Sequence, residues 1–197
     1  MNYLTIEEQS KKLKSIIKKN KDIMAILDFL ESINLPNFYL VAGTIFQTIW
    51  NYLDNKPINH NIKDIDIFYY DKDNLDKDYE DKIEEKIKHF LVDNNINLEI
   101  DVHNEARVHL WKKHNENPNV NYYDNTEDAI RRLISTVQAI GVTKLNNKIK
   151  IYAPYGLSDI FSKTIRPVKF STNSKIIYNK KVETWSKRFS NLNIIEW

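Results

Sequence analysis

The 197-residue chain contains no cysteine. This absence excludes disulfide bonds, zinc–thiolate sites and cysteine nucleophiles. No apolar run approaches the roughly 20 residues that a membrane-spanning helix needs, and residues 1–22 lack the apolar core of a signal peptide. We therefore expect a cytoplasmic protein that has no membrane partner.

Neither sign of charge dominates the sequence. Lysine and arginine number 29 and aspartate and glutamate 27, which leaves a formal net charge of +2. A chain so balanced is not held on nucleic acid by its bulk charge. The length suits one domain over residues 1–197 that buries a substantial core.

Glycine and arginine are scarce. The three glycines are Gly43, Gly141 and Gly156. The basic residues are nearly all lysine, and the arginines are Arg107, Arg131, Arg132, Arg166 and Arg188. Each glycine and each arginine therefore carries more information than it would in an average sequence.

Hydrophobic periodicity predicts a mixture of helices and strands. Helical spacing occurs over residues 7–19, 22–33, 44–53, 78–90 and 126–140, with Thr126 as a candidate N-cap and Gly141 as a C-cap. Strand patterns occur over residues 38–42, 62–70, 96–102 and 149–152. A short helix or turn is expected over 106–111 and a polar loop over 114–125.

These elements predict an α+β fold with a small mixed sheet surrounded by helices. Two N-terminal helices would occupy residues 5–34, and the core would span about 36–152. The C-terminal part, residues 153–197, would be mostly helical with a break at Pro167.

Two aspartates stand out in the strand pattern of residues 62–70. Alternate side chains of a strand share a face, so Asp64 and Asp66 project together while Ile65 and Ile67 face the core. Adjacent carboxylates repel each other unless water solvates them or a hard cation such as Mg²⁺ binds both. A solvated strand edge is the simpler alternative.

A third carboxylate follows in the next strand pattern, at Glu99 or Asp101. If this strand lies beside the first, three carboxylates would converge and form a two-metal site, whose ions lie roughly 3.5–4 Å apart. Such a site aligns an attacking hydroxyl and neutralises a transferring phosphoryl group. The alternative is that these acids form the polar face of an exposed strand.

The pair Gly43-Thr44 joins a predicted strand to a predicted helix. A helix N-terminus offers free N–H groups and the positive end of its dipole to anions. Gly43 would let a phosphate approach the backbone, and Thr44 would contribute a hydroxyl. An ordinary strand-to-helix turn with an N-cap explains the same residues.

The order of these features resembles the DNA polymerase β-type nucleotidyltransferase superfamily. Two further segments, Asn104-Glu-Ala-Arg-Val-His-Leu-Trp111 and Ala153-Pro-Tyr-Gly-Leu-Ser-Asp159, look like motifs of a bacterial nucleotidyltransferase-like family once classed as of unknown function. The resemblance runs from about Tyr39 to Arg188. It implies the polymerase-β-type fold and Mg²⁺- or Mn²⁺-dependent transfer of a nucleoside monophosphate from a nucleoside triphosphate.

The resemblance also assigns roles to residues of this chain. Gly43 and Thr44 match the phosphate loop, although Thr44 stands where serine is usual and only one glycine precedes it. Asp64 and Asp66 match the metal-binding pair. Asp101 matches the third carboxylate, which in active members helps to activate the acceptor hydroxyl. These three aspartates would be both metal ligands and catalytic residues.

Several other polar residues have two interpretations. Arg107 would either bind phosphate bidentately or form a structural ion pair. Lys144 would either contact a triphosphate or lie on the surface. Arg166 would contact either a ligand or an acidic side chain. His109 and Trp111 are more simply structural. The remaining histidines are interpreted as surface residues, and they are His60, His89, His103 and His114.

We therefore predict a Mg²⁺-dependent nucleotidyltransferase whose acceptor is a small molecule, an RNA end or a protein side chain. Two alternatives keep the fold without the chemistry. One is a nucleotide-binding regulator. The other is a non-catalytic interaction protein, such as one half of a toxin–antitoxin pair.

Overall fold

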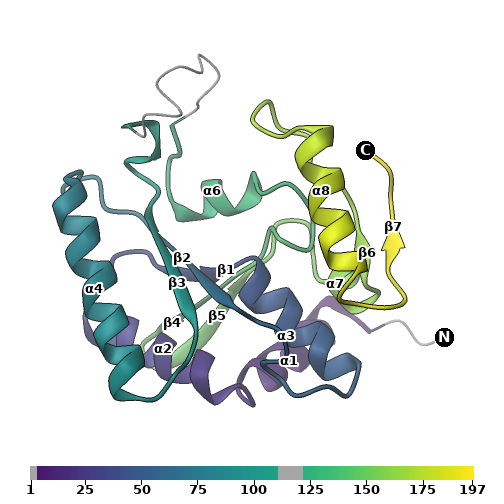
Figure 1. Ribbon diagram of the computed structural model, residues 1–197, viewed down its shortest axis with the longest axis horizontal. Helices are drawn as coiled ribbons and strands as arrows, with labels where there is room; N and C mark the ends of the chain where they lie inside the picture. The colour runs from purple at the N-terminus through teal and green to yellow at the C-terminus, as the bar shows by residue number, and fades with distance from the viewer. Residues whose placement is uncertain (1–3, 111–121) are drawn as a thin grey trace.

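A computed structural model describes residues 4–110 and 122–197. Its centre is a five-stranded sheet in the order β3-β2-β1-β4-β5 (Figure 1). The strands are β1 (Tyr39–Val41), β2 (Asp64–Tyr69), β3 (Glu99–Asn104), β4 (Gly141–Leu145) and β5 (Lys148–Tyr152). Within this sheet β2 and β3 run parallel, and the other neighbouring strands are antiparallel. The mixed sheet confirms the predicted α+β class.

Helices surround this sheet and connect its strands. They are α1 (Ile6–Ile17), α2 (Lys21–Ser32), α3 (Gly43–Leu53), α4 (Lys77–Asp93), the 3-10 turn η1 (Val108–Leu110), α6 (Thr126–Arg131), α7 (Ser158–Phe161) and α8 (Lys175–Ser186). A separate two-stranded sheet pairs β6 (Thr164–Ile165) with β7 (Asn193–Ile194). Within the described residues, no helix is long and apolar enough to cross a membrane.

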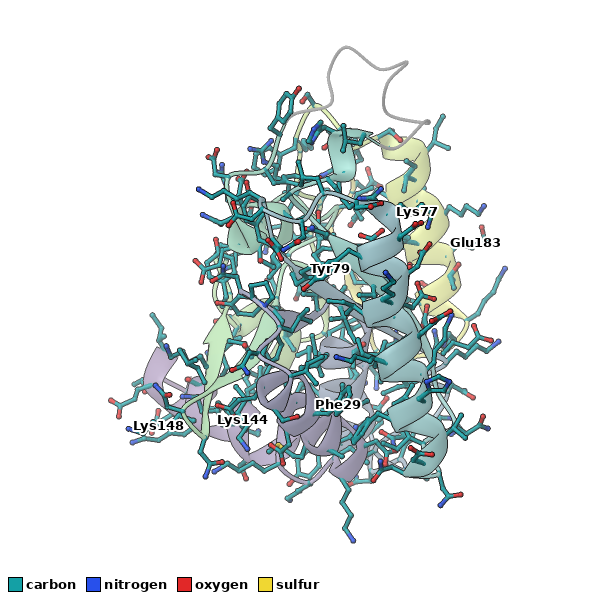
Figure 2. The ribbon with its side chains drawn as sticks, turned by 90° about the vertical axis from the view of Figure 1, so that its left-hand side faces the viewer. Phe29, Lys77, Tyr79, Lys144, Lys148 and Glu183 are labelled. Atoms are coloured by element: carbon teal, nitrogen blue, oxygen red, sulfur yellow. The ribbon has the colours of Figure 1, made fainter. Side chains whose placement is uncertain are left out.

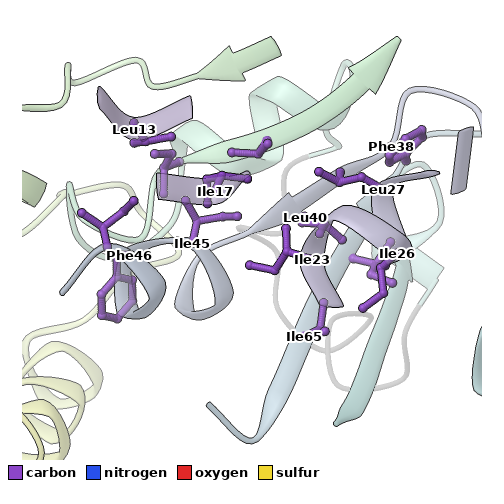
Figure 3. Close-up of a cluster of buried hydrophobic side chains, with 14 of the residues drawn as sticks. Leu13, Ile17, Ile23, Ile26, Leu27, Phe38, Leu40, Ile45, Phe46 and Ile65 are labelled. Atoms are coloured by element: carbon purple, nitrogen blue, oxygen red, sulfur yellow. The ribbon is translucent and has the colours of Figure 1, made fainter. Parts of the chain in front are cut away.

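One face of the main sheet is covered by the N-terminal helices, and this layer holds the main core. Leu40 of β1 and Ile65 of β2 point into it beside Ile17, Ile23 and other fully buried apolar side chains (Figure 3). Burying one such aliphatic side chain contributes about 1.5–3 kcal/mol. The alternation of Ile65 with its polar neighbours therefore sets which face of β2 is buried.

Helix α4 makes the crossover that parallel pairing of β2 and β3 requires. It packs against β3, and the ring of Phe90 stacks on Phe29 of α2 with centroids 4.2 Å apart. Figure 2 shows Phe29 between the N-terminal helices and α4. This packing places β3 at the edge of the sheet, next to β2.

The opposite face of the sheet carries a smaller apolar cluster. Val41, Ala42 and Ile130 form its buried part, with Phe68 of β2 packed against it. Helix α6 contributes Ile130 and so covers the sheet where β2 ends. The beginning of β2 on this face lies outside that cluster.

The predicted helix over 126–140 is wrong beyond Arg131, where α6 ends. The residues that follow use their backbone groups elsewhere: Val168 donates to the Ile134 carbonyl at 2.9 Å, and Thr136 donates to the Arg166 carbonyl at 3.0 Å. Several of these residues are β-branched, which disfavours continuation of the helix. Tertiary bonding therefore replaces the last turns of the expected helix.

The two predicted caps of that helix are also wrong. Asn125 is the N-cap, and the Thr126 hydroxyl instead donates to the Asn37 carbonyl at 2.6 Å. Gly141 opens β4 rather than ending a helix. A Cβ at Gly141 would lie 2.7 Å from Ile130 and 2.8 Å from Tyr39, so close packing excludes a side chain there.

The C-terminal part is less helical than expected, since only residues 158–161 and 175–186 are α-helical. Pro167 forms an isolated bridge with Ser135, and β6 pairs with β7 near the end of the chain. The short helix or turn expected over 106–111 is η1, but Trp111 and most of the loop that follows lie outside the described residues.

Candidate active site

Three aspartates lie on one face of two adjacent strands. Asp64 and Asp66 alternate along β2, and Asp66 pairs in register with Asp101 of the parallel strand β3. Paired residues on neighbouring strands point to the same side of a sheet. This is the face that carries the smaller apolar cluster, and the aspartates lie beyond that cluster, toward the start of β2.

The electrostatics of Asp66 reflect its neighbours. Burial, followed by the charges of Asp64 and Asp101, raises the pKa of the Asp66 carboxyl to about 6. Lys181 of α8 and His103 of β3 act in the opposite direction and lower that pKa. Asp64 and Asp101 are therefore close enough for their charges to oppose the ionisation of Asp66.

The carboxylates are nevertheless not arranged as a closed metal site. Among residues 4–110 and 122–197, no three carboxylate or histidine side chains are placed so that they could hold one metal ion. Asp101 contacts His103 instead, with Oδ1 3.0 Å from Nε2. His103 is half-buried rather than the surface residue expected from sequence. Its position two residues after Asp101 places both on one face of β3.

The start of α3 lies beside these carboxylates. Val41 pairs with Asp66 across β1 and β2, and the helix begins two residues later at Gly43. A Cβ at Gly43 would lie 3.9 Å from Oδ2 of Asp66. Ala42 lies between Val41 and Gly43 and has φ 51° and ψ −119°. L residues rarely adopt this conformation, and it often marks a functional site.

Thr44 is placed differently from the expected hydroxyl donor to phosphate. Its side chain is 1% exposed, and its hydroxyl donates to the Asp64 carbonyl at 3.5 Å. Thr44 therefore links the first turn of α3 to the start of β2. In this arrangement Gly43, and not Thr44, faces the carboxylates.

A cleft of about 450 Å³ opens next to Asp66. Its volume falls within the 300–1,000 Å³ that small-ligand sites occupy. The sheet supplies one wall through Asp66, Phe68 and His103, and cations lie on the other sides at Arg132 and Lys181. The remaining lining residues are Glu105, Val108, Tyr123, Ala129, Leu133, Ile134, Gln138, Thr172, Asn173 and Ile177.

A second cavity of about 430 Å³ lies between β3 and α4, and its lining includes Asp101 and His103. Arg107 also lines it, but is 8% exposed and engaged with the protein. Its Nη1 lies 2.6 Å from Oε1 of Glu80, and its Nε donates to the Leu75 carbonyl at 3.2 Å. This geometry is the structural ion pair that was one of the two alternatives for Arg107, and it leaves the guanidinium engaged with the protein.

Other basic residues singled out in the sequence also have internal partners. Lys144 is buried and bonded to Asp28 on α2, so neither triphosphate contact nor a free surface position describes it. Figure 2 shows Lys144 on the β4–β5 hairpin beside the N-terminal helices. Nε of Arg166 lies 3.1 Å from Oδ2 of Asp159, which is the acid contact considered above.

Four residues of the cleft that could take part in binding or proton transfer were not predicted from the sequence: His103, Glu105, Arg132 and Lys181. Glu105 is the clearest, because burial raises the pKa of its carboxyl well above the usual range. Its place inside the Asn104–Trp111 motif was the one available signal. The position of Lys181 depends on how α8 packs, which no local pattern reveals.

Comparison with known proteins identifies the fold and the family of the chain. The model of a family described as "Nucleotidyltransferase" matches residues 28–194. A solved structure described as "The NMR structure of the protein reveals a CCA-adding enzyme head domain" superposes with a TM-score of 0.77 and 23% sequence identity. The superposition covers 95% of this chain and 96% of that chain, which confirms the polymerase-β-type fold. Curated proteins give no significant match. The chain belongs to the nucleotidyltransferase family.

Proposed function

We propose that the protein transfers a nucleoside monophosphate from a nucleoside triphosphate to an acceptor hydroxyl in the presence of Mg²⁺ or Mn²⁺. The observation that carries the proposal is the juxtaposition of Gly43, at the start of α3, with the carboxylate of Asp66. A helix N-terminus binds phosphate, and a carboxylate binds a hard cation, so one Mg²⁺–triphosphate would engage both.

The donor set fits a magnesium ion. Asp64, Asp66 and Asp101 are hard oxygen ligands on one face of the sheet, and burial together with the charges of Asp64 and Asp101 raises the pKa of Asp66. Bound there, Mg²⁺ would supply the positive charge that offsets the phosphate oxygens during transfer. Binding would require these side chains to turn toward one another.

The residues of the chain have distinct proposed roles. The backbone at Gly43 receives the triphosphate, and Lys181 lies in the cleft, where its ammonium would face phosphate oxygens. Asp101 accepts the proton of the acceptor hydroxyl as the new oxygen–phosphorus bond forms. The bond from the α-phosphorus to the leaving oxygen breaks in the same step, and pyrophosphate departs.

A labelling experiment tests the proposal. The purified protein is incubated with Mg²⁺ or Mn²⁺, each of the four α-³²P-labelled ribonucleoside triphosphates, and a cell extract as the source of acceptors. We expect label to enter one acceptor class, and an Asp64→Asn variant to abolish transfer. Nucleotide binding without transfer would indicate a nucleotide-binding regulator, whereas the absence of binding would indicate an interaction protein.

A further inference from the structure

Gln47 and Arg188 meet beside Gly43 although 141 residues separate them in the chain. Gln47 lies one helical turn after Gly43 on the same side of α3. Arg188 follows the end of α8, in the C-terminal part of the chain. Its Nη2 donates to Oε1 of Gln47 at 2.6 Å and to the backbone carbonyl of Asn61.

This contact determines which way the Gln47 amide points. A guanidinium group only donates hydrogen bonds, so the amide oxygen of Gln47 must face Arg188 and the amide nitrogen must face away. Nε2 lies 2.7 Å from the position that a Cβ on Gly43 would occupy. The same position is 3.9 Å from Oδ2 of Asp66. The NH₂ group therefore faces the space above Gly43, beside the carboxylate.

The Nε2 donor has no acceptor within the described part of the chain. Gln47 is 5% exposed, yet none of residues 4–110 or 122–197 accepts a hydrogen bond from its NH₂ group. The enclosed side-chain atoms without partners are Asn51 Oδ1, Asp54 Oδ2 and Tyr69 OH, so Nε2 keeps contact with solvent. A largely buried donor without an acceptor, placed 2.7 Å from the position of a Cβ on Gly43, can receive an acceptor from a ligand bound there.

We propose that Gln47 is a nucleotide-binding residue whose NH₂ group donates to a phosphate oxygen above Gly43, and that Arg188 is the positioning residue that holds it there. This assignment rests on the proposed function, because it requires a triphosphate at the start of α3. It also gives the C-terminal part of the chain a role in the site. Arg188 forms no ion pair with any described carboxylate, and its guanidinium instead donates to Gln47 and to the Asn61 carbonyl.

A double-mutant cycle separates positioning from direct contact. The affinities of Mg²⁺–ATP, the other three triphosphates and Mg²⁺–tripolyphosphate are measured by calorimetry for wild type, Gln47→Leu, Arg188→Met and the double variant. We expect Gln47→Leu to weaken binding about tenfold, as loss of one hydrogen bond to a charged group does. The double variant should be no weaker than Gln47→Leu alone, whereas additive losses would overturn the positioning role.

Two further variants keep the test informative if Arg188→Met unfolds. Gln47→Glu is isosteric and still accepts from Arg188, but it presents an oxygen to the phosphate, so it should weaken binding more than Gln47→Leu does. Arg188→Lys should restore part of the affinity that Arg188→Met loses. Arg166→Met is the matched control, since Arg166 pairs with Asp159 on another part of the surface and its loss should leave affinity unchanged.

The outcomes distinguish this assignment from the function on which it rests. Wild-type protein that binds neither a nucleoside triphosphate nor tripolyphosphate overturns both. Wild-type protein that binds them, together with Gln47→Leu and Gln47→Glu variants of unchanged affinity, overturns the role of Gln47 alone. Thermal unfolding of every variant identifies any loss of affinity that comes from loss of the fold.

Discussion

A side chain on Gly43 would place its Cβ 3.9 Å from Oδ2 of Asp66, so the start of α3 and the acidic strand β2 share one small space. Antiparallel pairing of Val41 with Asp66 produces this proximity, because the helix starts where that pairing ends. The backbone proposed to bind phosphate and the carboxylate proposed to bind the cation are thereby brought together by two strands and one turn.

Replacement of Asp66 tests the electrostatics of the site. The pKa of Asp66 is about 6 in the folded protein against 3.8 for an unperturbed aspartate, so the folded state holds its proton to higher pH than the unfolded state does. Stability is therefore lost as pH rises from about 4 to about 6, by at most roughly 3 kcal/mol. Asp66→Asn should remove this loss.

The free energy of unfolding by denaturant is measured for wild type and Asp66→Asn at pH 4 and pH 7.5. The variant should match wild type at pH 4 and exceed its stability at pH 7.5. Asp73→Asn, at an exposed loop position, serves as the control and should show no such divergence. Parallel pH dependence of wild type and Asp66→Asn would contradict the raised pKa of Asp66.

Asp101→Asn should separate binding from chemistry. Two carboxylates suffice to hold a metal bound to nucleotide, so appreciable Mg²⁺–triphosphate affinity should remain. Transfer should fall by orders of magnitude, because activation of the hydroxyl contributes several kcal/mol. Triphosphate affinity by calorimetry and label transfer, both measured on the same preparation, test whether binding is retained while transfer is lost. Transfer at the wild-type rate in Asp101→Asn would show that Asp101 does not activate the acceptor hydroxyl.

Gly43→Val should weaken triphosphate binding. The new side chain would meet Nε2 of Gln47 at 2.7 Å and would occupy the approach to the helix backbone. We expect a loss of at least tenfold, since backbone N–H groups and the Gln47 donor are both blocked. Tripolyphosphate titration of the folded variant measures it, and unchanged affinity would show that Gly43 forms only a turn.

Ala42→Gly should stabilise the protein. Ala42 has φ 51° and ψ −119°, which glycine adopts without the steric cost that a Cβ incurs. The relief should exceed the entropic cost of glycine and yield a net gain of about 1 kcal/mol. Thermal unfolding checks the sign. Ala25→Gly, in the middle of α2, is the control and should instead destabilise by about 1 kcal/mol.

Arg107→Met should affect stability rather than binding. Removing the cation leaves Glu80 buried beside an apolar side chain, which typically costs about 3–5 kcal/mol. The double variant Glu80→Gln with Arg107→Met should recover part of that loss, because no buried charge remains. Chemical denaturation measures stability, and triphosphate affinity of the folded double variant should equal that of wild type. A specific loss of affinity would restore Arg107 as a nucleotide ligand.

The local periodicity of the sequence by itself determined the buried and polar faces of β2 and the junction of β1 with α3. The two-residue period of β2 put Asp64 and Asp66 on one face and Ile65 on the other, as the structure has them. The change of pattern at Gly43 marked the junction of β1 and α3. The face that a side chain occupies and the end of a strand depend on the backbone geometry of neighbouring residues. A single segment of the sequence is therefore enough to predict them.

Only the tertiary structure decided which distant residues meet. The register of Asp101 with Asp66 depends on the crossover through α4, and the pairing of Arg188 with Gln47 depends on where the chain emerges from α8. Arg107 pairs with Glu80 because α4 packs against β3. A glycine is needed at the start of β4 because Ile130 and Tyr39 fill the space beside Gly141. Burial of apolar surface sets these positions over the whole chain, and no local pattern encodes the result.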